Sequence, residues 1–170
     1  MNLEMNNMAK GEKSEKQNLN AISIALKKEE DSYTFYKNAE KTVLFKPLKT
    51  LFRDLAKEEV KHKNILIKEA RKLEGGAKKV DKMTKGPGKS KDYGLSKYLL
   101  PQNVKPNMGY QEALIVAMKR EEKAVELFDY LKSITTDKKL KDTFNTLYKW
   151  EIEHLRMLEE KYDEDILTEN

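Results

Sequence analysis

The chain carries the same helical pattern twice, at a constant offset of 92 positions. The segment AISIALKKEE, which begins at Ala21, aligns with ALIVAMKREE, which begins at Ala113. Without a gap, the same offset aligns LKTLFRDLAKEEVKH from Leu48 with LKDTFNTLYKWEIEH from Leu140. One offset that holds across two segments and the turn between them indicates an internal duplication. We therefore expect two halves that fold alike.

Four stretches place apolar residues at the three- and four-residue spacing of an amphipathic helix. They run from about Asn18 to Leu44, Pro47 to Gly75, Gly109 to Ser133 and Thr136 to Tyr162. A proline suits the first turn of the second helix, the Gly75-Gly76 pair suits its end, and Asn107 is a candidate cap for the third helix. Strand-like alternation is absent from the sequence. The pattern predicts an all-α fold.

The lengths of the connections determine how these helices are joined. The links near Phe45 and Thr135 are very short, whereas the connection over residues 75–108 is far longer than bundle helices need. Short links produce antiparallel hairpins, and a long one can return along a whole bundle. The sequence therefore predicts a four-helix bundle of two antiparallel helix hairpins joined by a long crossover. It spans residues 18–163, with a flexible tail at 1–17 and another tail at 164–170.

Composition excludes several classes of function. The sequence contains no cysteine, which excludes disulfides, thiol catalysis and thiolate-bound metal centres on this chain. No apolar run approaches the roughly 20 residues of a membrane span. The N-terminal residues lack the apolar block of a signal peptide, so we expect a cytoplasmic protein. The net charge of +5 arises from the lysine-rich stretch of residues 77–91, which we interpret as a solvated loop rather than a nucleic-acid site.

The two histidines define the candidate site. His62 and His154 each follow a glutamate by three positions, in Glu59-Val-Lys-His62 and Glu151-Ile-Glu-His154. Residues three apart share a helix face, so each carboxylate and imidazole point the same way. Both glutamates also lie on the apolar stripe of their helix. A single such pair is usually a surface feature, but two at one offset favour a buried site.

Two further glutamates complete the pattern. Glu29 and Glu121 lie within the apolar stripes of the first and third helices, also at the 92-residue offset. Four ionised carboxylates in a core would repel one another severely, and two divalent cations would cancel their charge. Carboxylate and imidazole together suit iron, manganese or zinc. The adjacent glutamates are rotated off this face and are expected to be solvated: Glu30, Glu58, Glu122 and Glu153.

Two aromatic residues lie close to these glutamates. Tyr36 is either a core residue or a hydrogen-bond donor to one of the carboxylates. Its repeat equivalent is Phe128, so we expect an asymmetry in which the Glu121 side is the less restrained. Trp150 is adjacent to Glu151 but is expected to face elsewhere and to pack.

The segments ALKKEEDSYTFY, LAKEEVKH, AMKREEKAVELF and LYKWEIEH resemble the ferritin-like superfamily, and most closely its rubrerythrin branch. The resemblance covers residues 20–74 and 109–162. It implies a ferritin-like bundle with a dinuclear iron site whose ligands are Glu29, Glu59, His62, Glu121, Glu151 and His154. By position, Glu59 and Glu151 would bridge the two ions, and Glu29 and Glu121 would be terminal ligands.

The sequence departs from the rubrerythrin pattern in two ways. The further glutamate that usually follows the third-helix ligand by three positions is Ala124 here, and its repeat equivalent is Ser32. This puts in doubt the exchange of a glutamate and a histidine at one iron that the family implies. The sequence also lacks the cysteines of a rubredoxin domain, so we expect electrons to come from a separate donor such as a rubredoxin or a reductase. Eight residues follow Tyr162, so we do not expect the fifth helix of a storage ferritin.

The resemblance implies a cytoplasmic, homodimeric diiron oxidoreductase that reduces peroxide or dioxygen during oxidative stress. Three alternatives remain open. The protein could be a ferroxidase with Fe(II) as its substrate, or an iron-binding module that sequesters the metal without turnover. A DNA-protecting mini-ferritin that uses the lysine-rich loop is less favoured, because that family builds its site between subunits.

Overall fold

The computed structural model describes residues 2–73, 75–84 and 104–168, and every regular element in these ranges is an α-helix. The helices are α1 (Asn2–Thr42), α2 (Lys46–Ala70), α3 (Gly76–Thr84), α4 (Tyr110–Ile134) and α5 (Lys138–Thr168). Among the described residues, none of the helices has the length and apolarity that a membrane crossing requires. The predicted all-α fold is confirmed.

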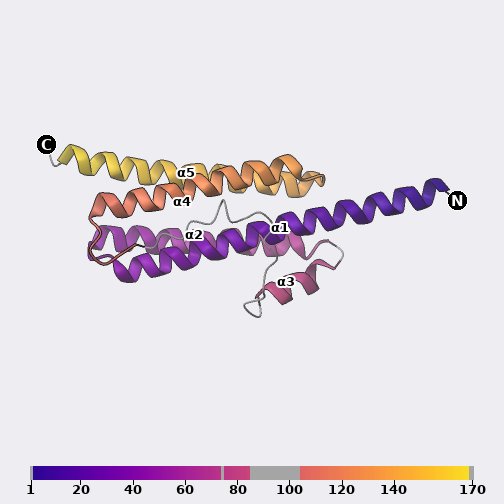
Figure 1. The fold of residues 1–170 in the computed structure, drawn as a ribbon, viewed down its shortest axis with the longest axis horizontal. Coiled ribbons are helices and arrows are strands. Elements are labelled where there is room, and N and C mark those ends of the chain that lie inside the picture. Colours follow the sequence, from indigo (N-terminus) through magenta and orange to yellow (C-terminus); the bar gives the residue numbers. More distant parts are fainter. Residues whose placement is uncertain (1, 74, 85–103, 169–170) are drawn as a thin grey trace.

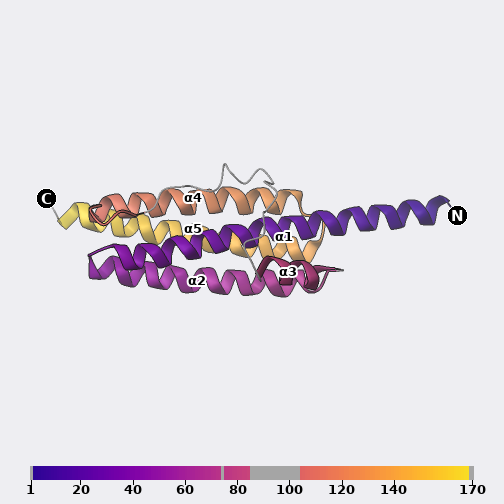
Figure 2. The same ribbon diagram turned by 60° about the horizontal axis from the view of Figure 1, so that its bottom comes forward.

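The four long helices pack as two pairs. Helix α1 lies along α2, and α4 lies along α5, with fewer contacts between the pairs (Figures 1 and 2). Three residues separate α1 from α2, and three separate α4 from α5, which forces each pair to be antiparallel. This is the predicted four-helix bundle of two hairpins, consistent with a ferritin-like fold.

Local signals account for the starts of two helices, α2 and α5. Pro47 lies in the first turn of α2, where its missing N–H costs nothing. The Asp137 carboxylate accepts a hydrogen bond from the backbone N–H of Leu140 at 2.8 Å and so caps α5. Asn107, however, does not cap α4. That helix begins after Gly109, which is extended and forms no side-chain cap.

The first and last helices, α1 and α5, are longer than the periodicity of the sequence indicates. Helix α1 begins at Asn2 rather than near Asn18, and it extends beyond the other helices in Figure 1. No proline interrupts residues 2–17, and contacts with the α4–α5 turn hold their last part: Gln17 Nε2 donates to the Ile134 carbonyl at 2.8 Å. Helix α5 continues to Thr168, so the segment expected as a C-terminal tail is largely helical as well.

The crossover contains a helix that the sequence did not predict. Helix α2 ends at Ala70, and Gly75 adopts a φ of 69°, which favours glycine, just before α3. A Cβ on Gly76 would lie 1.8 Å from the Ala70 carbonyl oxygen, so this position also requires glycine. Val80 of α3 is buried in the core. The next part of the crossover, residues 85–103, includes the end of the lysine-rich stretch and lies outside the described residues.

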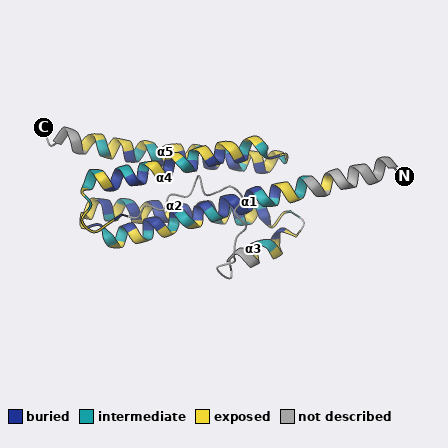
Figure 3. Cartoon of the chain, viewed as in Figure 1, coloured by how far each residue is buried: buried dark blue, intermediate teal, exposed yellow. Residues whose placement is uncertain are grey.

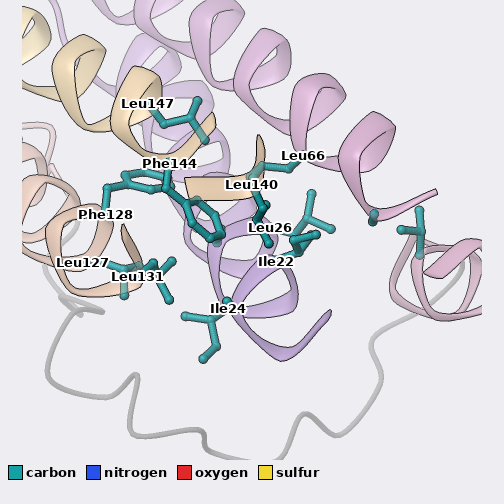
Figure 4. Close-up of a cluster of buried hydrophobic side chains, with 14 residues drawn as sticks. Ile22, Ile24, Leu26, Leu66, Leu127, Phe128, Leu131, Leu140, Phe144 and Leu147 are labelled. Atoms are coloured by element: carbon teal, nitrogen blue, oxygen red, sulfur yellow. The ribbon is translucent and has the colours of Figure 1, made fainter. Parts of the chain in front are cut away.

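Two clusters of buried apolar side chains form the core, and both draw on all four long helices. Figure 3 shows buried positions along each of these helices. Figure 4 shows the first cluster, in which Leu26, Leu66 and Leu140 gather with the ring of Phe144. Phe128 and Phe144 have ring centroids 6.2 Å apart there, and the repeat-equivalent rings of Tyr36 and Phe52 are 5.8 Å apart in the second cluster. The duplication in the sequence is therefore a duplication of packing.

Candidate metal centre

A layer of polar side chains separates the two apolar clusters. On every long helix these residues lie between the part that enters one cluster and the part that enters the other. All six are buried: Glu29, Glu59, His62, Glu121, Glu151 and His154. The structure thus brings together every residue that the sequence proposed as a ligand, at mid-bundle and on four helices. The adjacent Glu30, Glu122 and Glu153 are exposed and Glu58 is half-exposed, as expected.

The imidazole of His62 faces three carboxylates. Its Nδ1 lies 3.4 Å from Glu29 Oε2, 3.5 Å from Glu59 Oε2 and 3.0 Å from Glu151 Oε1. Glu29 belongs to the same hairpin as His62, whereas Glu151 comes from the other. Three carboxylates and one imidazole from three helices therefore converge on one point.

His154 repeats this arrangement in the second half. Its Nδ1 lies 3.6 Å from Glu121 Oε2, 3.6 Å from Glu151 Oε2 and 4.0 Å from Glu59 Oε1. Glu59 and Glu151 each direct one oxygen toward His62 and the other toward His154. These two glutamates are shared between the halves, and Glu29 and Glu121 are not.

The six residues thus form two overlapping groups of four. The groups are Glu29, Glu59, His62 and Glu151, and Glu59, Glu121, Glu151 and His154. Within each group one ligand atom per residue lies within 4.8 Å of all the others, a spacing at which four ligands can hold one metal ion. Two such groups that share two carboxylates can hold a pair of ions.

The side chains of the cluster do not form all the hydrogen bonds that their buried oxygen and nitrogen atoms could make. Among the described residues, each of the six has at least one fully buried side-chain oxygen or nitrogen without a hydrogen-bond partner. Such atoms are costly in a protein core and occur where a ligand completes them. The donor set, four carboxylates and two imidazoles, fits a pair of divalent metal ions.

The same crowding shifts the ionisation of these groups. Burial and the charge of Glu29 raise the pKa of Glu59 well above its ordinary value. Burial lowers the pKa of His154, but the facing carboxylates of Glu121 and Glu151 outweigh burial and raise it to about 11. Burial and the charge of Glu59 oppose ionisation of Glu151, yet the two imidazoles hold its pKa at about 2. Without metal, the cluster therefore holds protons at positions that cations would take.

Tyr36 supports the second half of the cluster rather than its own. It is fully buried, and its hydroxyl donates a hydrogen bond to Glu121 Oε1. Burial and the charge of Glu121 raise the pKa of Tyr36 well above its ordinary value, so the hydroxyl remains a donor. The expected asymmetry exists, but its direction was wrong: Glu121 is the restrained carboxylate, and Glu29 Oε1 has no partner among the described residues.

Trp150 contacts the cluster, contrary to the expectation that it faces elsewhere. Its ring stacks on that of His62, with centroids 5.3 Å apart and an interplanar angle of 16°. His62 stacks in turn on His154, at 5.4 Å and 13°. The sequence did contain a sign of this contact. Trp150 lies one turn before His154 on α5, and residues four apart share a helix face.

Two buried cations also lie next to the cluster and were missed in the sequence. Lys28 precedes Glu29, and its repeat equivalent Arg120 precedes Glu121. Lys28 Nζ donates to Ser32 Oγ at 2.6 Å, and Arg120 donates to Asp31. The signal was a basic residue at the same place in both halves.

Both the sequence and the fold of this chain are similar to those of known proteins. The Rubrerythrin family model matches residues 20–162, a range that includes both hairpins and all six polar residues. The fold is similar to that of a hypothetical protein from Pyrococcus furiosus, with a TM-score of 0.57 and 23% sequence identity, over 86% of this chain and 88% of that chain. At that identity the likeness shows the shared fold. No curated protein matches the chain.

Proposed function

Because the chain belongs to the rubrerythrin family, we propose that it is a non-haem diiron oxidoreductase. It reduces peroxide or dioxygen with electrons from an external donor such as a rubredoxin or a reductase. It works in the cytoplasm and as a homodimer. The observation that carries this proposal is the pair of overlapping four-residue groups that share Glu59 and Glu151.

The proposed ligand roles follow from which oxygen faces which histidine. Glu59 and Glu151 each direct one oxygen to each histidine, so they would bridge two ions. Glu29 faces His62 alone, and Glu121 faces His154 alone, so they would be terminal ligands. Each ion would then receive one imidazole, one terminal carboxylate and two bridging carboxylates.

Charge favours two divalent ions at this site. Four carboxylates carry four negative charges, which two divalent cations neutralise, and the imidazoles bind as neutral ligands. Manganese or zinc fits the same donor set, so metal supply and geometry select among them. The reduction of peroxide or dioxygen needs a metal that changes its oxidation state, which zinc does not, and iron is proposed because the chain belongs to the rubrerythrin family.

The protein's own residues shape the chemistry that the ions would supply. Iron held by these six residues would supply the redox chemistry that reduces peroxide or dioxygen. The apolar clusters on either side keep bulk water out of the layer. The Tyr36 hydroxyl holds Glu121 in one orientation, whereas Glu29 lacks this restraint and has more freedom to shift as the charge of the site changes.

The test is metal analysis of the purified protein, followed by anaerobic reduction and one addition of hydrogen peroxide. We expect about two iron ions per chain and rapid loss of one equivalent of peroxide as the reduced form is oxidised. A ferroxidase would instead turn over excess Fe(II) without a donor and leave a ferric product. Bound iron without oxidant consumption would indicate a sequestering protein and overturn the proposal.

A further inference from the structure

A column of three nearly parallel rings connects the cluster with the protein surface. Trp150 stacks on His62 and His62 stacks on His154, with ring centroids 5.3 and 5.4 Å apart. We propose that Trp150 is an electron relay. It supplies single electrons to the Glu/His cluster when peroxide exceeds the electron supply, and an external one-electron donor refills it at the surface. This inference rests on the proposed function.

Exposure distinguishes Trp150 from the rest of the column. His62 is 1% exposed and His154 is 8% exposed, whereas Trp150 is 39% exposed. One face of the indole therefore contacts a proposed ligand while the rest of the ring is open to a donor. Ile152, on the other side of Glu151 in the chain, is also exposed and leaves this part of α5 accessible.

Two other oxidisable side chains, Tyr36 and Tyr148, are less suited to this role. Tyr36 contacts Glu121 but is 0% exposed, so an electron lost from it could not be replaced directly from solution. Tyr148, on the same helix as Trp150, packs against the apolar cluster and has Lys132 over its ring. Indole is also among the side chains that lose an electron most readily.

The relay is present in only one half of the molecule. The repeat equivalent of Trp150 is Glu58, which is half-exposed and paired with Lys61. The two halves match at all six cluster residues but not here. The duplication therefore does not explain Trp150, and its ring contact with His62 is a separate feature of this chain.

The electron balance is simple. Peroxide takes up two electrons and two protons and becomes two molecules of water. When the metal-loaded cluster cannot supply both electrons to peroxide, each missing electron comes from the indole π system of Trp150. The indole then becomes a radical cation. One electron from an external one-electron donor then restores the indole, so no covalent bond in Trp150 is made or broken.

The first test measures how closely Trp150 lies to the bound metal and needs no catalytic turnover. Trp150 is the only tryptophan of the chain, so tryptophan fluorescence reports on this position alone. Anaerobic titration with Fe(II) should quench most of this fluorescence and level off at the metal content found by analysis. Closed-shell Zn(II) should quench it several-fold less. Iron binding without quenching would overturn the contact and the proposal with it.

The second test reads the electron loss. Hydrogen peroxide is added in excess to iron-loaded and zinc-loaded protein without a donor, and the products are examined by electron paramagnetic resonance and peptide mass spectrometry. We expect a tryptophan radical and oxygen addition at Trp150, several-fold more in the iron-loaded form. Ascorbate, a one-electron donor, should suppress both.

Variants separate a relay from a role in packing. Trp150→Phe keeps an aromatic ring over His62 but is much harder to oxidise, so oxidation should move to Tyr36 and to methionines, and the protein should lose activity after several-fold fewer turnovers. Trp150→Tyr should restore protection in part. Tyr148→Phe is the matched control and should behave as wild type. Equal tolerance of peroxide in Trp150→Phe and wild type would overturn the relay.

The outcomes also distinguish this inference from the proposed function. If the protein binds no iron, both the proposed function and the electron relay are wrong. A protein that binds iron and consumes peroxide, with Trp150 unmodified and the radical on Tyr36, would leave the proposed function standing and overturn the relay alone.

Discussion

The hydroxyl of Tyr36 on α1 donates a hydrogen bond to the carboxylate of Glu121 on α4, across the interface between the two hairpins. A residue of the first repeat thus orients a candidate ligand of the second. Phe128, the repeat equivalent of Tyr36, has no hydroxyl and cannot return the bond to Glu29. The near two-fold cluster therefore restrains Glu121 with a hydroxyl and offers Glu29 no such donor.

Substituting Tyr36→Phe should weaken the protein without abolishing metal binding. The change leaves Glu121 Oε1 buried without its donor, and the free energy of unfolding should fall by about 1–3 kcal/mol. Iron content should remain near the wild-type value, while turnover with peroxide changes because Glu121 is no longer held. Urea denaturation, metal analysis and a peroxide assay measure the three effects.

Tyr33→Phe provides the control for this substitution. Tyr33 lies one turn earlier on the same helix and is only partly buried. If both variants match the wild type in stability and turnover, the hydroxyl of Tyr36 has no functional role. Complete loss of iron from Tyr36→Phe would show instead that the hydroxyl is needed to assemble the site.

Removal of a shared glutamate should affect both metal positions, whereas removal of an unshared one should affect only one. Glu59→Ala and Glu151→Ala each delete an oxygen from both four-residue groups, so both ions should be lost on dialysis. Glu29→Ala and Glu121→Ala each delete a ligand from a single group and should keep about one ion. Metal analysis after dialysis gives the stoichiometry.

Glu58→Ala and Glu122→Ala are the matched controls, because each is the neighbour of a cluster glutamate but faces solvent at least in part. Both should retain the wild-type metal content. The assignment of shared and unshared ligands fails if Glu59→Ala retains as much iron as Glu58→Ala. Circular dichroism checks that each variant remains helical.

The metal-free protein should become less stable as the pH rises. The folded protein holds a proton on His154 up to its raised pKa of about 11, whereas the unfolded chain loses it near the ordinary histidine pKa of 6.5. Between these values the folded state binds more protons, so the contribution of His154 is complete below the lower one and is lost toward the upper one. The slope should be on the order of −1 kcal/mol per pH unit.

Loading with metal should reverse this dependence. Metal requires neutral imidazoles and ionised carboxylates, so its binding becomes stronger as protons leave. Denaturation curves at a series of pH values, with iron and with a chelator, measure both slopes. If stability depends on pH in the same way with iron and with a chelator, metal does not replace the protons on the imidazoles.

Truncation of a repeated core ring should be costly. Phe144→Ala removes a fully buried ring that packs against Phe128, and the free energy of unfolding should fall by about 3–5 kcal/mol. Phe45→Ala is the control, because that ring is 46% exposed in the α1–α2 turn and its loss should cost far less. Similar losses in chemical denaturation would show that Phe144 is not part of a tight core.

Several features of this protein could be predicted from local sequence alone. The helical period determines which residues share a face, so the spacing in Glu59-Val-Lys-His62 placed a carboxylate and an imidazole together. The cost of burying Glu29 and Glu121 in apolar stripes indicated a compensating cation. The constant offset then related the halves, and the connection lengths determined the antiparallel pairs.

Helix boundaries were less predictable. The start of α1 at Asn2 depends in part on Gln17 contacting the α4–α5 turn, a partner more than a hundred positions away. Helix α3 depends on the close approach of Gly76 to the carbonyl of Ala70 and on burial of Val80. Neither condition can be evaluated before the helices are packed.

The sequence by itself determined the bundle, its duplication and the six inward-facing polar residues, because these follow from helical periodicity and from the cost of buried charge. Only the tertiary structure decided which side chains meet across helices. Tyr36 reaches Glu121, 85 positions away, and Trp150 stacks on His62 from the opposite hairpin. Such contacts depend on the rotation and separation of packed helices, which the pattern along any one helix does not contain.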